Sequence, residues 1–488
     1  MAFVEVAANS DSGAYEIENS VRYNQVDSPQ LKFEPSSDMA SRKTMTWSFW
    51  CKRSVLNGTG AYQFCMAVDD TDNGFNPVLR FNNSGSGDTL RWSGHNESTP
   101  LRFVTNVVFK DPAAWYHIVV MMDTTQSTNT DRLKLYVNGV QTTDFSEVYY
   151  GSQNDDTNWG KGSRSHDIGF MDHTSESQTS KYFDGYLADF YYINAQNLTA
   201  SDFGEFNDNG VWIPKKYAGS FKSDSFKLEI KQTGTSANAS GIGADTSGNG
   251  NHLTVANLAA GDITTDTPSN NFATLNPLMA GRGSTLSEGN CKVSGESDNN
   301  YDISTFGTDM KFYFEWKLDE AHSGGNGIKL SVMHIAELEK NDNYANFQTK
   351  YVKTYTNSND GKYQDGNGQN PSGGGSLTRA TSGDIIMVAC DGGNGKVWFG
   401  VNGTWLSSGD PENGTGGFHG SWSAGMETGI YFACPIYSVT NGAGQINFGN
   451  PSFSISSGNS DANGYGNFEY AVPGGFYALC TKNLAEYG

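Results

Sequence analysis

The chain has 488 residues, of which 58 are glycine and 13% are aromatic, and its net charge is −21. This length fits about two or three domains, and the aromatic side chains can fill more than one core, which excludes global disorder. The acidic balance excludes general nucleic-acid binding, because negative charges repel a phosphate backbone.

The first residues contain no basic and apolar leader, and the longest apolar run, 118–122, is far shorter than the ~20 residues that span a bilayer. We therefore expect neither a signal peptide nor membrane insertion. The chain has six cysteines without a C-x-x-C pair, which predicts reduced, mostly buried thiols. They are Cys51, Cys65, Cys291, Cys390, Cys434 and Cys480.

The first half of the chain contains short runs of alternating, β-branched or aromatic residues, separated by Gly, Asn, Asp and Ser. This spacing is typical of an antiparallel sandwich. The dipeptide Asn138-Gly139 follows an alternating run and predicts a two-residue hairpin turn. A closing strand and a short helix near Thr199 to Glu205 complete the pattern. The expected strands cover 45–51, 62–68, 78–82, 115–122, 133–140 and 182–193.

These elements predict an N-terminal arm over 1–19 and a β-sandwich over 20–205. From 206 to 275 the hydrophobic pattern weakens, which predicts an irregular connector. A second set of strand patterns predicts another sandwich, with a C-terminal extension, over 276–488. Its expected strands cover 311–318, 327–334, 384–391, 396–402, 429–437 and 445–448, and the polar segment 357–375 is expected as a loop. The fold class is therefore all-β, with two antiparallel jelly-roll sandwiches joined by an irregular connector.

Two sets of ordered motifs resemble known domains. The first domain resembles laminin-G-like, concanavalin-A-like jelly rolls, and the second is similar to a SPRY domain. The first resemblance rests on TWSFW (46–50), WYHIVV (115–120), LKLYVNG (133–139) and FDGYLADF (183–190). The second rests on FYFEW (312–316), SGDIIMVACD (382–391), NGKVWFGVNGTW (394–405) and QINFGNPSF (445–453).

Three further segments, 245–252, 266–277 and 473–484, are similar to virion-associated proteins of tailed bacteriophages. This resemblance implies a fibre, appendage or decoration protein, made in the host cytoplasm and released by lysis. The expected function is binding of a host-surface or environmental glycan, or of neighbouring virion proteins. A purely structural virion component is the alternative, and a glycan-degrading hydrolase is the third possibility.

The sequence does not support catalysis. Jelly-roll glycosidases need closely spaced carboxylates on one strand. The nearest group here, Glu315 with Asp319 and Glu320, has the wrong spacing, because residues 315 and 320 fall on opposite strand faces. His117 lies in an apolar run, where a packed histidine is the better interpretation than a catalytic one. We therefore expect a protein that is not an enzyme.

Three tryptophans lie in polar contexts between the strand motifs, where an aromatic ring can stack on a sugar and nearby polar groups can bind its hydroxyls. They are Trp92, Trp159 and Trp422, the candidates for glycan binding. A loop anchored on the core is the alternative for each.

Two acidic clusters have the oxygen donors that calcium prefers, with solvated turns as the alternative. One consists of Asp69, Asp70, Asp72 and Asn73, and the other of Asp245, Asn249 and Asn251. No cofactor is required, and calcium is the candidate metal. A surface module of weak single-site affinity gains from multiple copies, so we also expect a homo-oligomer, with contacts from the arm 1–19 and the aromatic segment before Pro473.

Overall fold

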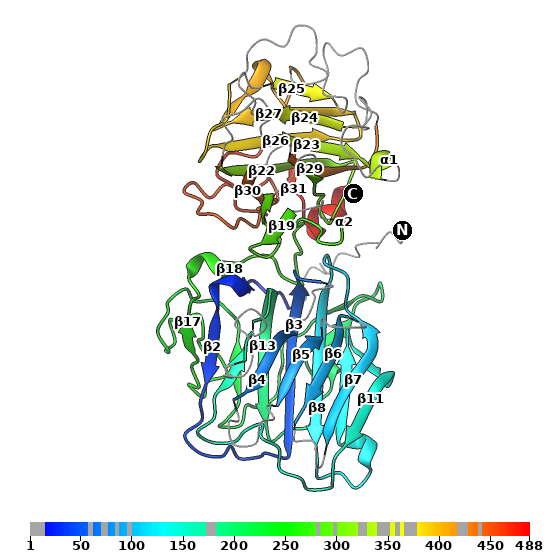
Figure 1. Cartoon of the computed structure of the whole chain (residues 1–488), viewed down its shortest axis with the longest axis vertical. Coiled ribbons are helices and arrows are strands. Elements are labelled where there is room, and N and C mark those ends of the chain that lie inside the picture. Colours follow the sequence, from blue (N-terminus) through cyan, green and yellow to red (C-terminus); the bar gives the residue numbers. More distant parts are fainter. Residues whose placement is uncertain are drawn as a thin grey trace. The chain divides into compact units, whose positions relative to one another are not determined.

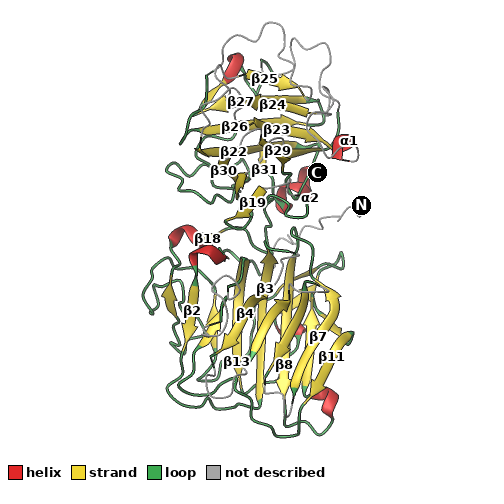
Figure 2. Ribbon diagram, viewed as in Figure 1, coloured by secondary structure: helices red, strands yellow, loops and turns green. Residues whose placement is uncertain are grey.

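The computed structural model is all-β, and its described residues divide into two compact units, 15–269 and 270–488. Figures 1 and 2 show that strands dominate both units and that helices are few and short. The expected fold class, two antiparallel β-sandwiches, is confirmed. The structure describes residues 15–56, 62–69, 77–82, 87–94, 100–171, 182–279, 284–295, 300–320, 329–338, 352–356, 362–365, 378–416, 428–437 and 442–488.

The first unit consists of two large antiparallel sheets. One sheet has the order β10 (Val140–Thr142), β9 (Leu133–Val137), β8 (Trp115–Asp123), β3 (Thr44–Arg53), β13 (Gly185–Asn194), β1 (Ser20–Tyr23) and β18 (Ile263–Thr264), and β16 (Phe226–Leu228) also pairs with β13. The other has the order β11 (Phe145–Tyr150), β7 (Leu101–Val108), β6 (Thr89–Ser93), β5 (Val78–Asn82), β4 (Tyr62–Val68), β12 (His166–Ile168), β2 (Gln30–Phe33) and β17 (Thr254–Ala256).

Aromatic side chains from both sheets form the core of this unit. Trp47 of β3 lies 5.7 Å from Trp92 of β6 and 5.0 Å from Trp159, measured between ring centroids. The predicted hairpin turn is present between β9 and β10, where Asn138 and Gly139 adopt φ angles of 46° and 81°. Two positive φ angles in succession are what a two-residue turn of this kind requires.

Short elements complete the first unit. They are the 3-10 helices η1 (Gln25–Asp27), η2 (Asn129–Asp131), η4 (Ala200–Asp202) and η5 (Ala260–Asp262), and the hairpin of β14 (Gly204–Phe206) and β15 (Trp212–Pro214). The short helix expected near Thr199 is η4, which begins after Thr199 because Asp202 accepts a hydrogen bond from the Thr199 backbone N–H.

Most of the segment 206–275, expected as a connector, instead completes the first sandwich, to which it belongs as far as Ser269. Its strands β16, β17 and β18 pair with β13, β2 and β1. Its side chains Phe226, Leu228 and Leu253 are buried in the main core. The division between the units falls after Ser269. The segment was expected as a connector because strands of two or three residues contain few side chains and leave a weak hydrophobic pattern.

The second unit has two sheets. One has the order β19 (Ser284–Ser287), β20 (Lys292–Gly295), β30 (Gly442–Asn447), β22 (Lys311–Glu320), β26 (Ile385–Asp391), β27 (Lys396–Val401) and β28 (Thr404–Trp405), with β31 (Tyr477–Ala478) parallel to β22. The other has the order β21 (Asn300–Tyr301), β29 (Tyr431–Tyr437), β23 (Lys329–His334), β24 (Val352–Thr356) and β25 (Lys362–Asp365). The helices are η7 (Leu406–Ser408), α1 (Ile335–Leu338) and α2 (Thr481–Tyr487).

The C-terminal segment packs against β22, β26 and β27 of its own unit. Phe468 and Phe476 are buried in a cluster with Tyr313 and Trp398, and Tyr465 and Tyr470 are half-buried against it. Aromatic groups expected at an oligomer interface therefore contribute here to an internal core. Among the described residues, no helix combines the length and the apolar character needed to cross a membrane.

Candidate functional site

The outer face of the second sheet in the first unit carries a row of arginines. In β5, β6 and β7, buried core residues alternate with residues that point away from the core. Arg80 and Arg91 are direct cross-strand partners, and Arg102 stands diagonally next to Arg91 because residue 104 is the partner of Arg91. The arginine face consists of Arg80, Arg91 and Arg102 with Tyr62, Glu147 and Tyr149.

Aromatic rings support two of these arginines. The Arg80 guanidinium lies 3.5 Å from the ring centroid of Tyr62, and that of Arg102 lies 4.9 Å from Tyr149. Arg102 also donates a 2.5 Å hydrogen bond to Glu147. A guanidinium that is stacked on a ring keeps its planar edge of N–H donors in a fixed orientation.

The arginine face is chemically suited to an anion. Like charges that oppose each other across strands destabilise a sheet, and here the Arg102–Glu147 pair and the tyrosine rings offset that repulsion. The chain as a whole is acidic, with a net charge of −21. Arg102 already contacts Glu147 through Nε and Nη2, and Arg80 and Arg91 add two guanidinium groups on the same sheet face, where they can bind carboxylate, sulfate or phosphate groups.

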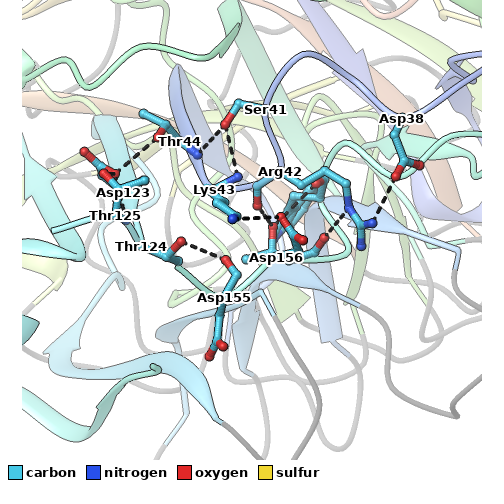
Figure 3. Close-up of polar contacts among 12 residues, drawn as sticks. Asp38, Ser41, Arg42, Lys43, Thr44, Asp123, Thr124, Thr125, Asp155 and Asp156 are labelled. Carbon is cyan, nitrogen blue, oxygen red and sulfur yellow. Dashed lines mark hydrogen bonds and ion pairs between the residues drawn. The ribbon is translucent and has the colours of Figure 1, made fainter. Parts of the chain in front are cut away.

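A second polar group lies where β3 begins and β8 ends, among three loops (Figure 3). Arg42 donates to Asp38 over 3.0 Å and to the Thr157 carbonyl over 2.8 Å. Lys43 lies 3.9 Å from Asp156, and the Thr124 hydroxyl donates to the Asp155 carbonyl. These bonds connect the three loops to one another.

Asp123 occupies the other end of this group in Figure 3. It accepts hydrogen bonds from Thr44, Thr125, Gln126 and Asn197. Although burial raises the pKa of Asp123, these donors outweigh that effect and lower it. Because its oxygens already accept these hydrogen bonds, Asp123 has a structural role in this polar group.

Two of the three tryptophans expected to bind glycan are core residues. Trp92 and Trp159 are each 0% exposed, and the Trp159 indole N–H donates to the Ser93 carbonyl over 3.0 Å. Neither ring presents a face to a ligand, so the expectation is wrong for both. The alternation in β6 indicates that the Trp92 ring is buried, since residues 90 and 92 share the inner face. Trp422 lies outside the described residues.

The second acidic cluster is a hydrogen-bonded turn. The Asp245 carboxylate accepts the backbone N–H groups of Lys227, Ser247 and Asn251 and the Ser247 hydroxyl. The amide groups of Asn249 and Asn251 donate to the Ser225 carbonyl. A calcium ion needs oxygen lone pairs, and the Asp245 carboxylate already uses its own for these hydrogen bonds. Calcium binding at this cluster stays a prediction.

In the first acidic cluster, only Asp69 lies within the described part of the chain, and its N–H donates to the Ser165 carbonyl over 3.0 Å. Asp70, Asp72 and Asn73 lie outside it. Calcium binding at this cluster stays a prediction.

Ser48 and His117 lie 2.9 Å apart and superficially resemble a nucleophile with its base. The Trp212 indole N–H donates to His117 Nδ1 over 2.9 Å, so Nδ1 is the acceptor and Nε2 carries the proton. Nε2 therefore donates to Ser48 and cannot accept the serine proton. Burial also lowers the pKa of His117 to about 3. This agrees with the packed-histidine interpretation.

Glu315 and Asp319, the nearest carboxylates to a glycosidase pattern, have structural contacts. Glu315 accepts from Tyr313, from Asn447 and from the backbone N–H groups of residues 469 and 470. Asp319 accepts two hydrogen bonds from Gln445 and pairs with Lys292 at 3.3 Å.

The arginine face was not identified from the sequence. Arg80, Arg91 and Arg102 recur every eleven residues, and each follows and precedes an apolar residue in a short alternating run. That spacing brings the three onto one face only if the three runs are consecutive antiparallel strands. The sequence contained this signal, but reading it required the strand order.

The family model of the concanavalin A-like lectin/glucanases superfamily matches residues 25–202. The first unit therefore contains a laminin-G-like, concanavalin-A-like domain, as expected. No curated protein matches the chain.

Several solved structures are similar to parts of the chain. The SPRY domain of human HERC1 is 16% identical, with 35% of this chain and 96% of that chain covered and a TM-score of 0.27. The heptameric SAP-like pentraxin of Limulus polyphemus is 15% identical, with 38% and 80% covered and a TM-score of 0.26. Domains LG4-5 of the mouse laminin alpha1 chain are 9% identical, with 92% of each chain covered and a TM-score of 0.29.

Proposed function

We propose that this chain is a non-catalytic binding protein whose first sandwich binds an acidic glycan through the arginine face. The family match supports ligand binding in general, since it includes lectins. The observation that carries the proposal is the row of Arg80, Arg91 and Arg102, stacked in part on tyrosine rings. A glycan with carboxylate, sulfate or phosphate groups fits both the cationic donors and the aromatic surface.

Titration calorimetry at low and moderate salt tests this proposal, with a polyuronate and a neutral glucan as ligands. We expect binding of the polyuronate alone, weakened by salt because the contact is ionic. Arg91→Gln should weaken it about tenfold or more, since a charge-assisted hydrogen bond contributes about 1.5–3 kcal/mol. Lys216→Gln is the matched control, because it removes the same charge from an exposed side chain. Equal binding of both glycans, or equal loss in both variants, would refute the proposal.

The proposed setting is the surface of a tailed-bacteriophage particle, supported by the sequence similarity of segments 245–252, 266–277 and 473–484. Host-surface glycan and neighbouring virion proteins are then the partners, and a homo-oligomer presents several copies. Mass spectrometry of purified particles should detect the chain, and light scattering of the purified chain reports its oligomeric state. A chain found in particles without any glycan affinity would favour the structural alternative, and release of reducing sugar would favour the hydrolase.

A further inference from the structure

A buried lysine in the first unit contacts two carboxylates. Lys227 Nζ lies 2.7 Å from Glu229 Oε1 and 3.4 Å from Asp189 Oδ1. It also donates to the Tyr15 hydroxyl over 3.0 Å, which in turn donates to Asp189 over 3.2 Å. The side chains of Lys227 and Asp189 are 6% and 3% exposed. One amine, two carboxyl groups and one hydroxyl thus share a site in which Lys227 and Asp189 are buried, while Glu229, 20% exposed, borders solvent.

The strand pairing and a bulge in β13 bring these groups together. Strands β13 and β16 are antiparallel, and Tyr191 is the partner of Lys227. The register of β13 against β3 shifts between residues 188 and 191, and within this bulge Asp189 has a φ angle of 46°. A bulge that contains a residue with a positive φ angle changes the direction of one side chain. An aspartate in this left-handed region is strained, and such strain is typical of functional sites.

Aromatic rings enclose the amine. Lys227 Nζ lies 5.2 Å from the ring centroid of Tyr15 and 5.0 Å from that of Tyr191. In such surroundings an ion pair loses much of its hydration, so the neutral pair of amine and carboxylic acid comes closer to it in free energy than in water.

The two carboxyl groups differ in acidity. Burial raises the pKa of Asp189, against the opposing effect of Lys227. Burial also acts to raise the pKa of Glu229, but contacts with Lys227 and Lys231 outweigh it and lower that pKa. Environments that push two pKa values apart assign the roles of acid and base. Asp189 is thus the carboxyl group that binds a proton more readily, and Glu229 is the one that stays ionised. Burial acts to lower the pKa of Lys227, but its contacts with Asp189 and Tyr15 outweigh that effect and raise it.

We propose that Lys227 and Asp189 form an intramolecular isopeptide bond, with Glu229 as the proton acceptor. Glu229 takes a proton from the Lys227 ammonium, and the freed amine attacks Cγ of protonated Asp189, forming the C–N bond. The surplus proton on nitrogen passes to the hydroxyl of Asp189, which leaves as water when the C–O bond breaks. Glu229 then releases its proton to solvent. This proton balances the one that Asp189 took up from solvent before the reaction.

The reaction needs no oxidant and no further reactant, and Lys227 Nζ lies 3.4 Å from Oδ1 of Asp189, the oxygen bonded to the carbon that it would attack. The product joins β13 to β16 covalently and closes the chain between residues 189 and 227. A bond of this kind protects a surface-displayed sandwich against unfolding. It is independent of the proposed glycan binding, since none of these groups belongs to the arginine face.

The intact mass of the purified full-length protein tests the proposal. We expect it to be lower than the sequence mass by one water molecule, and tryptic mapping should find peptides 182–215 and 223–231 joined through Lys227 and Asp189. Lys227→Arg keeps the charge but removes the nucleophile, so it should restore the full mass. Glu229→Gln should slow or abolish the link, and Lys231→Arg, an exposed neighbour, should retain it.

The Lys52–Asp266 pair is an internal control. It is equally buried, at 2.8 Å, but its aspartate contacts the Trp115 indole N–H, which exchanges no proton near neutral pH. We expect its peptides to remain separate. Full mass and no linked peptide in the folded wild type would overturn the proposal, whatever the variants do. An undiminished link in Glu229→Gln would remove Glu229 from the mechanism.

Discussion

At the scale of single residues, the first unit buries neutral histidines that make specific hydrogen bonds. His117 connects Ser48 of β3 to Trp212 of β15, and its ring stacks on Trp50 at 4.7 Å between centroids. His166 accepts the Gly160 N–H over 2.9 Å, and burial lowers its pKa to about 4. Such groups stabilise the fold only while they are neutral, so they make its stability depend on pH.

The pKa of His117 falls from 6.5 to about 3 on folding. A group with a depressed folded-state pKa contributes stability that is complete above the unfolded value and is lost as pH falls toward the folded value. Between pH 7 and 5 the loss should be about 2 kcal/mol for this histidine. His117→Gln keeps a donor and an acceptor, so urea unfolding of the first unit should be less pH-dependent by that amount. His252→Gln is the control. An equal loss of pH dependence in that variant would contradict the role assigned to His117.

At the scale of elements, one carboxylate holds the C-terminal segment against β22. Glu315 accepts four hydrogen bonds, two of them from the backbone N–H groups of Glu469 and Tyr470, and burial raises its pKa despite these donors. The segment near residues 469 and 470 belongs to none of the sheets, so Glu315 supplies the acceptors that a neighbouring strand would otherwise provide.

Glu315→Gln should therefore release this segment. The amide nitrogen of glutamine cannot accept a hydrogen bond, so at least one buried N–H loses its acceptor, at a cost of about 1–3 kcal/mol. Hydrogen exchange at residues 469 and 470 should accelerate, while exchange within β26 and β27 changes less. Glu412→Gln, which alters an exposed side chain of the same unit, should leave exchange at both residues unchanged. Equal protection in Glu315→Gln would show that packing alone holds the segment.

The elements also show which parts of the fold a sequence can reveal. The runs 62–68 and 78–82 match β4 and β5 residue for residue, because β4 is buried along nearly its whole length and the end of β5 alternates half-buried and buried side chains. β16 and β17 were missed, since three residues contain too few side chains to show a period. β25 lies within the segment expected as a loop, where mostly polar residues gave no strand pattern, and it pairs with the preceding strand β24.

The candidate binding residues also depend on contacts that local sequence does not show. Trp92 and Trp159 are in polar sequence surroundings, yet both rings lie in the core, because Trp92 lies on the inner face of β6 and the loop residue Trp159 turns inward between the sheets. The arginine face depends on strand order and register, which bring residues eleven positions apart onto one surface. Local sequence predicts strands well, but it does not by itself determine which strands become neighbours.

At the scale of the whole molecule, six free cysteines are distributed over both units, and every one of them is buried. Burial raises the pKa of Cys51 to about 12, against the opposing effect of Arg53, and raises that of Cys480 to about 12. It raises the pKa values of Cys65, Cys390 and Cys434 as well. The thiolate is the reactive form, so these thiols are doubly protected, by lack of access and by lack of charge.

Thiol labelling should therefore report unfolding of each unit separately. A rise in pKa from 9.0 to about 12 leaves roughly a thousandfold less thiolate near pH 8, so the native protein should react very slowly with iodoacetamide. In denaturant without reductant we expect six labelled cysteines. Peptide mapping at intermediate denaturant should label Cys51 and Cys65 together, since both lie in the core of the first unit, and the cysteines of the second unit as another group. Rapid labelling of a cysteine in the native state would show that its part of the core opens locally, and fewer than six labels in denaturant would show that a disulfide has formed.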